Sequence, residues 1–220
     1  MKLNNKIIIA LIPSIIMAFG TNYLELGETQ QGMLESFTAG LLIIGGTMLL
    51  IEFKENKSKN SLKMGLYGLF FSLFIIIISD NFTNDSTLPS LYLDSLSDGL
   101  LLGAVSTSIL RSNKLLSTLI PISFEMMLVG STTVALLLKK KKKHPKLDVS
   151  FASVILFISV IIGSYSGKYI NENFIMGFGS TAMLWLGLVN FLPEINTFTN
   201  YKLINGILII VGIVCGTFLD

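Results

Sequence analysis

The chain has 220 residues, of which 51% are hydrophobic and 14% are charged, and its formal net charge is +2. A soluble domain carries about 25% charged residues, so this composition, with a mean hydropathy of +0.71, predicts an integral, multi-pass membrane protein. The small net charge, with basic residues concentrated at one loop, gives no support for a nucleic-acid partner. The single cysteine excludes an intrachain disulfide.

Apolar blocks separated by short polar segments run along the whole chain. Because a hydrocarbon core about 30 Å thick requires about 20 apolar residues per helix, the blocks predict an all-α bundle of eight transmembrane helices. We expect residues 1–220 to form one membrane domain surrounded by the lipid bilayer. The predicted spans cover residues 7–24, 32–53, 62–80, 88–110, 115–138, 149–170, 174–192 and 203–219.

The first apolar block has two interpretations. Lys2 and Lys6 flank the start of an apolar run, and Ala18-Phe19-Gly20 resembles the small-residue cleavage site of a signal peptide. The run continues to Leu24, however, and is then long enough to span the bilayer. We therefore expect an uncleaved first transmembrane helix.

The fourth and fifth predicted spans, 88–110 and 115–138, are the least secure. If they formed a single span or a re-entrant hairpin, nearly all the positive charge would lie on one side of a seven-span protein, so this alternative stays open. As two separate helices, they would turn Pro121 and Glu125 toward the bundle interior, where neighbouring helices or water satisfy polar groups.

A lysine run at residues 139–143, followed by Lys146, separates the fifth and sixth spans. Such a run is typical of a solvated flank that keeps a loop in the cytoplasm and is attracted to anionic lipid headgroups. We therefore expect this loop to be cytoplasmic. His144 lies among these lysines, where it is a poor ligand for a metal cation.

Glycines recur at four-residue spacing in three of the predicted spans. The pairs are Gly99 with Gly103, Gly163 with Gly167, and Gly212 with Gly216. In lipid, small residues at this spacing let helix backbones approach closely. The pattern predicts a compact bundle.

Acidic residues inside the fourth and fifth spans are the strongest indication of function. Asp94 and Asp98 are four residues apart and share one face of a helix. With Glu125 they are the acidic residues predicted deepest in the bundle, and no histidine or arginine in the spans is available to neutralise them. Acidic groups at membrane depth mark ion or substrate paths. The alternative is that they are protonated, or lie near a helix end that faces water.

The candidate site is rich in oxygen, because Ser95 adds a hydroxyl to the three carboxylates. Oxygen ligands suit magnesium, manganese and calcium, and are also used by zinc and ferrous iron. No nucleotide-binding motif and no serine or cysteine catalytic set occurs, so we do not expect an enzyme or an ATP-driven pump.

Motifs in two further spans resemble the ZIP family of divalent metal transporters. In the seventh span, residues 178–194 follow a family pattern that ends in Pro193 and Glu194, with Trp185 for the usual tyrosine and Asn190 for the inner glutamate. The second span carries the related Phe-x-Ala-Gly pattern at residues 37–40. The resemblance implies an eight-helix fold with its fourth and fifth helices at the centre and both chain termini outside.

The resemblance also implies the site. The family's fourth-helix motif, HNxxDG, corresponds to residues 94–99, where Asp94 replaces histidine, Ser95 replaces asparagine, and Asp98 and Gly99 are kept. Glu125 matches the fifth-helix glutamate. By carry-over, Asp98, Glu125, Asp94 and Ser95 would bind the transported cation, which would be zinc, iron or manganese, and we expect Asp98 and Glu125 to face one another.

Other family ligands are missing, since Pro121 and Val160 stand where the family has them. A non-transporting protein or partner subunit that has lost the metal site is therefore the alternative. The oligomeric state stays open, with a homodimer as the assembly considered.

Overall fold

The computed structural model describes residues 3–23, 28–55, 59–83, 85–107, 114–166, 169, 171–198 and 202–219. Within these ranges the chain is helical and contains no strand. The helices in chain order are α1 (Leu3–Ala10), α2 (Ile12–Tyr23), α3 (Glu28–Glu55), α4 (Lys59–Thr83), α5 (Thr87–Thr107), α6 (Lys114–Lys139), α7 (Pro145–Ser166), α8 (Glu172–Trp185), a π-helical segment η2 (Leu186–Phe191), α9 (Leu192–Phe198) and α10 (Lys202–Leu219).

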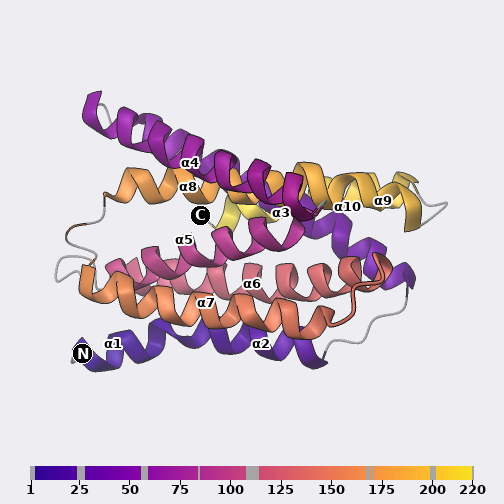
Figure 1. Ribbon diagram of the computed structural model, residues 1–220, viewed down its shortest axis with the longest axis horizontal. Coiled ribbons are helices and arrows are strands. Elements are labelled where there is room, and N and C mark those ends of the chain that lie inside the picture. The colour runs from indigo at the N-terminus through magenta and orange to yellow at the C-terminus, as the bar shows by residue number, and fades with distance from the viewer. Residues whose placement is uncertain are drawn as a thin grey trace.

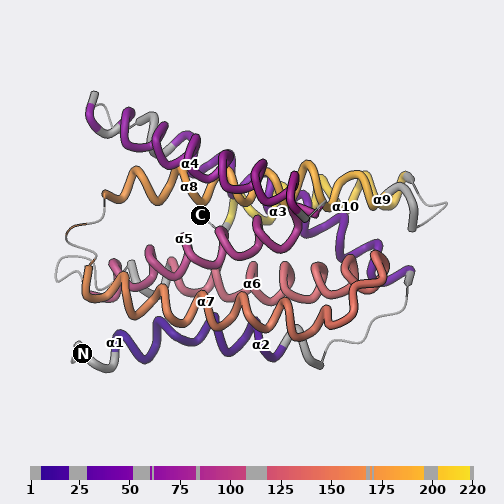
Figure 2. The backbone as a smooth tube through the Cα atoms, in the orientation of Figure 1, coloured from indigo at the N-terminus to yellow at the C-terminus, as the bar shows by residue number. Residues whose placement is uncertain are grey.

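These elements form eight rods, one at each predicted span, among the residues that the structure describes. The pair α1 and α2 makes up the first rod, which follows one edge of the bundle (Figure 2). The continuous run α8, η2 and α9 makes up the seventh. The expectation of an all-α bundle is confirmed.

Helix α5 lies between two groups of helices (Figure 1). On one side are α3, α4, α8 and α10, and on the other are α1, α2, α6 and α7. It packs most extensively on α7, then on α8, and also contacts α1, α4 and α6. This position buries most of the polar side chains of α5, among them Asp94, Ser95 and Asp98.

Glycine contacts hold α5 against α7. A Cβ atom added at Gly99 would lie 2.6 Å from the carbonyl oxygen of Leu156, and one added at Gly163 would lie 2.5 Å from that of Leu100. A Cβ atom added at Gly103 would lie closer still to the carbonyl oxygen of Val160. For Gly99, Gly103 and Gly163 the prediction of close backbone approach is confirmed, whereas Gly167 lies outside the described residues.

Five helical segments are long and apolar enough to cross a membrane, among the residues described. They are Thr29–Ile51, Leu62–Phe82, Thr118–Lys139, Pro145–Ser166 and Glu172–Ile195. The α6 segment is 72% buried and the α4 segment only 22%, so α6 is an inner helix and α4 a peripheral one. Large apolar side chains cover the outer faces of α4, α7 and α10. These features are those of a multi-pass membrane protein.

One detail of the predicted spans differs. The first span is interrupted at Leu11, because the chain makes a turn there and α2 restarts with Pro13 in its first turn, where the missing N–H costs nothing. The fourth and fifth spans are separate helices of 21 and 26 residues, as predicted, and do not merge into a single helix. Of these two, only α6 is among the five membrane-length apolar segments.

Candidate functional site

The predicted acidic pair lies on α5 and is buried. Asp94 is 0% exposed and Asp98 is 2% exposed, and Ser95 beside them is also fully buried. The two carboxyl groups share one face of the helix and are close enough to interact electrostatically. The alternative in which the acidic pair lies near a helix end that faces water is therefore wrong.

Most of the polar atoms in this group have no hydrogen-bond partner. Among the described residues, both side-chain oxygens of Asp94, Oδ2 of Asp98 and the hydroxyl of Ser95 are buried without one. A buried polar atom without a partner costs about 1–3 kcal/mol, and more if it is charged. Two adjacent carboxylates are also unable to be ionised together in such a place unless a cation joins them.

Glu125 lies on α6 and is 6% exposed, so its predicted burial is confirmed. Within the described ranges, however, no three His, Cys, Asp or Glu side chains lie close enough together to hold one metal ion. The structure thus brings Asp94, Ser95 and Asp98 together, and it does not add Glu125 to them as a third acidic ligand. That Asp98 and Glu125 face one another stays a prediction.

One buried acid was missed from the sequence. Glu35 on α3 is 0% exposed, and neither of its carboxylate oxygens has a hydrogen-bond partner among the described residues. The predicted span that contains Glu35 began at residue 32. Helix α3 actually begins at Glu28, so Glu35 lies almost two turns inside it. The Phe-x-Ala-Gly pattern at residues 37–40, directly after Glu35, was the available signal.

Most of the lysine run is exposed, as a solvated flank requires, and three of its lysines also form ion pairs that the sequence did not predict. Lys140 and Lys142 both lie 3.2 Å from the carboxylate of Asp85, in the connection between α4 and α5. Lys139 lies 2.6 Å from Glu194 in α9. The long apolar stems of lysine let these ammonium groups reach across the end of the bundle. The run therefore ties α6 to two other segments.

Asp85 has an environment that favours its charged form. Burial alone would raise the pKa of its carboxyl group. The side-chain and backbone hydrogen bonds from Thr87, the charge of Lys140 and the hydrogen bond from Lys142 outweigh burial, so the pKa is lowered from its ordinary value of 3.8. The Thr87 amide donates to Asp85 Oδ1 at 3.1 Å. This carboxylate is held as a partner of the lysines.

A second polar group links the same connection to η2. The Trp185 indole donates to the hydroxyl of Ser86 at 2.8 Å, and that hydroxyl donates to Asn190 Oδ1 at 3.1 Å. The hydroxyl of Thr87 accepts from Lys140 at 3.0 Å. The π-helical turn carries Asn190 into the bundle, where it is buried. Such turns occur frequently at functional sites, and here one helps to close an end of the bundle.

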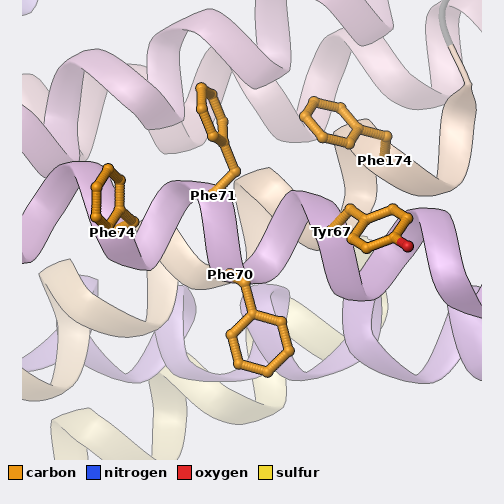
Figure 3. A pocket seen from close by; sticks show the side chains of 5 residues that line it. All are labelled: Tyr67, Phe70, Phe71, Phe74 and Phe174. Carbon is orange, nitrogen blue, oxygen red and sulfur yellow. The ribbon is translucent and has the colours of Figure 1, made fainter.

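The open groove on α4 is apolar (Figure 3). It has a volume of about 610 Å³ and is lined by Tyr67, Phe70, Phe71, Phe74 and Phe174. None of the buried acidic side chains lines it, so it lies apart from the candidate site. Its position on the least buried of the membrane-length helices is that of a surface facing lipid.

Together these features define a class of protein: an all-α bundle with membrane-length apolar helices and unpartnered acidic side chains in its interior. Comparison with known proteins adds no family to this class, because no protein-family model and no curated protein matches the chain. The resemblance to the ZIP family therefore rests on the motif residues alone.

Proposed function

We propose that the chain is a ZIP-like transporter that moves a divalent cation through the bundle along α5. The observation that supports this most directly is the group of buried oxygens on Asp94, Asp98 and Ser95 that have no hydrogen-bond partner in the described structure. A divalent cation would supply the charge and the ligand contacts that the protein itself does not.

The chemistry of the group favours a transported ion over a permanently bound one. Carboxylate and hydroxyl oxygens replace part of the hydration shell of zinc, iron or manganese, but these three residues leave several coordination positions to water or to Glu125. A site that is too weak for tight binding is useful in a transporter, because the ion must leave as well as enter. The transport would be driven by ion gradients, without ATP and without catalysis.

The alternative is a bundle that has lost transport and acts as a partner subunit. One observation favours it, namely that the described residues contain no group of three metal-ligating side chains. Val160, at the position of an expected family ligand, is fully buried and packed against α5 at Gly103. These two facts make a direct transport measurement necessary.

The test is uptake of radioactive zinc, iron, manganese and cadmium into proteoliposomes that contain the purified protein. We expect uptake of at least one cation above that of empty vesicles, and its loss in Asp94→Asn, which removes charge and keeps volume. The matched control is Asp80→Asn, because Asp80 on α4 is exposed. Uptake equal to that of empty vesicles for every cation would establish the non-transporting alternative.

A second variant tests the ligand set. Asp94→His restores the imidazole of the family motif, and imidazole is a favoured zinc ligand. We expect this variant to transport zinc more readily relative to manganese than the unchanged protein does. An unchanged ratio would mean that residue 94 does not contact the ion.

A further inference from the structure

Glu35 is a buried acid that the proposed cation path does not use. It lies on α3, outside the helix that carries Asp94 and Asp98, and its side chain is completely buried. Both carboxylate oxygens lack a hydrogen-bond partner among the described residues. A carboxylate in this condition is expensive to keep ionised, so a positive charge must come to it.

The contacts of α3 show where Glu35 faces. Thr38, one turn further along the same face, shares a hydrogen bond of 3.1 Å with the hydroxyl of Thr132 on α6. Lys139, about two turns beyond Thr132 on α6, acts electrostatically on Glu35, and so does Glu194 of α9. Glu35 therefore points toward the end of the bundle at which α6 terminates.

The nearest positive charge is already shared. Lys139 lies 2.6 Å from Glu194 and forms an ion pair with it. Segment η2, which also packs on α3, contains no acidic or basic residue, and the one basic residue of α10 is Lys202 at its first position. Helix α8 contributes only Glu172, at its opposite end. The repulsion by Glu194 further disfavours a bare carboxylate at Glu35.

The ion pair whose charges act on Glu35 is itself exposed to water. The side chains of Lys139 and Glu194 are 31% and 28% exposed, whereas Glu35 is not exposed at all. Glu35 is thus a fully buried acid within electrostatic reach of a water-accessible pair. A proton can be passed to such a group from one polar side chain to the next, whereas a hydrated metal ion needs an open passage.

We propose that Glu35 is a proton-binding site, filled and emptied from the end of the bundle that the Lys139 and Glu194 pair occupies, and that its proton is exchanged for the transported cation. The step is Glu35–COOH giving Glu35–COO⁻ and H⁺, with the proton leaving to water by way of the Glu194 carboxylate. The coupling to a cation rests on the proposed function, and the proton site does not.

Infrared difference spectroscopy of the purified protein at neutral pH tests the proton site alone. The spectrum of the unchanged protein minus that of Glu35→Gln should show the carbonyl stretch of a protonated carboxylic acid. Glu35→Asp should move this band without removing it, and so provides the same information if Glu35→Gln does not fold. Glu172→Gln is the matched control, because Glu172 is exposed, and it should leave the band unchanged. Absence of the band from the difference spectra of both Glu35 variants would overturn the inference.

Proteoliposome uptake tests the coupling. A pH gradient imposed at constant cation concentration should drive uptake in the unchanged protein and not in Glu35→Gln, while uptake down a cation gradient should persist in both. Equal responses to the pH gradient would overturn the coupling. If the unchanged protein takes up no cation at all, the proposed function fails, and the infrared band alone decides the proton site.

Discussion

Asp85 and Asp94 are buried carboxylates only nine residues apart in the chain, yet their surroundings are opposite. Asp85 has two lysines at 3.2 Å and accepts a backbone hydrogen bond from Thr87. Asp94 has no hydrogen-bond partner for either side-chain oxygen among the described residues. Asp85 therefore forms ion pairs that join parts of the fold, whereas the carboxyl group of Asp94 has no positively charged partner among the described residues.

The difference follows from distance to water. Lysine reaches Asp85 because its side chain stays partly exposed, at 31% for Lys140 and 36% for Lys142. About two turns deeper on α5, a lysine would have to bury its charge completely, and the chain places none there. Positive charge at Asp94 must come from outside the protein, which is the physical basis of the proposed cation path.

The largest expected effect is on cation uptake, which should depend strongly on Asp98 and much less on Asp85. Asp98→Asn should reduce cation uptake at least about tenfold, since removing one carboxylate ligand costs the ion more than about 1.4 kcal/mol, while Asp85→Asn should leave uptake measurable. Uptake assays at equal protein content provide the measurement. Normal uptake by Asp98→Asn would show that the ion path runs elsewhere.

The next effect concerns stability, for which we expect the substitution of Asp85 to cost more than the substitution of Asp94. Asp85→Asn should lower the free energy of unfolding by about 1–3 kcal/mol, because it removes hydrogen bonds to charged partners. Asp94→Asn should not lower it, because no partner is lost. Unfolding curves in detergent provide the comparison, with Asp80→Asn as the exposed control, for which we expect a change within about 0.5 kcal/mol. A larger loss of unfolding free energy for Asp94→Asn than for Asp85→Asn would contradict this difference between the two carboxylates.

At acidic pH, Asp85 should no longer contribute to the stability of the folded protein. Its pKa in the folded protein is below the ordinary value of 3.8, so folding favours the ionised form. The stabilisation is therefore fully present above 3.8 and is lost as the pH falls through the lower, folded-state value. The difference in unfolding free energy between the unchanged protein and Asp85→Asn, followed from neutral pH downward, should stay constant and then shrink below 3.8. A difference that began to shrink near neutral pH would contradict this assignment.

The smallest effect concerns the partly exposed pair at the same end. Glu194→Gln should cost at most about 1 kcal/mol of stability, because Lys139 and Glu194 are each nearly a third exposed and water replaces the lost contact. Added salt should reduce this cost further. A cost as large as that of Asp85→Asn would mean that both pairs are equally shielded from water.

The predictions from sequence succeeded where a residue's own chemistry decides its place. The apolar blocks marked all eight rods, Gly99, Gly103 and Gly163 marked the contacts of α5 with α7, and Asp94 and Asp98 are buried on one face of one helix. They were incomplete where the boundary of an element matters. Glu35 was not recognised as a buried acid, and the start of its helix was predicted four residues too late.

The sequence by itself determined that this chain is an apolar, all-α bundle with acids inside it, because hydrophobic blocks and side-chain spacing are local properties. Only the tertiary structure decided which acids have partners. Asp85 pairs with Lys140 and Lys142, just beyond the end of α6, across 55 and 57 residues of chain, and Asp94 has no such partner in the described bundle. Pairing of this kind depends on which helix ends come together in space, and that is set by the packing of whole helices.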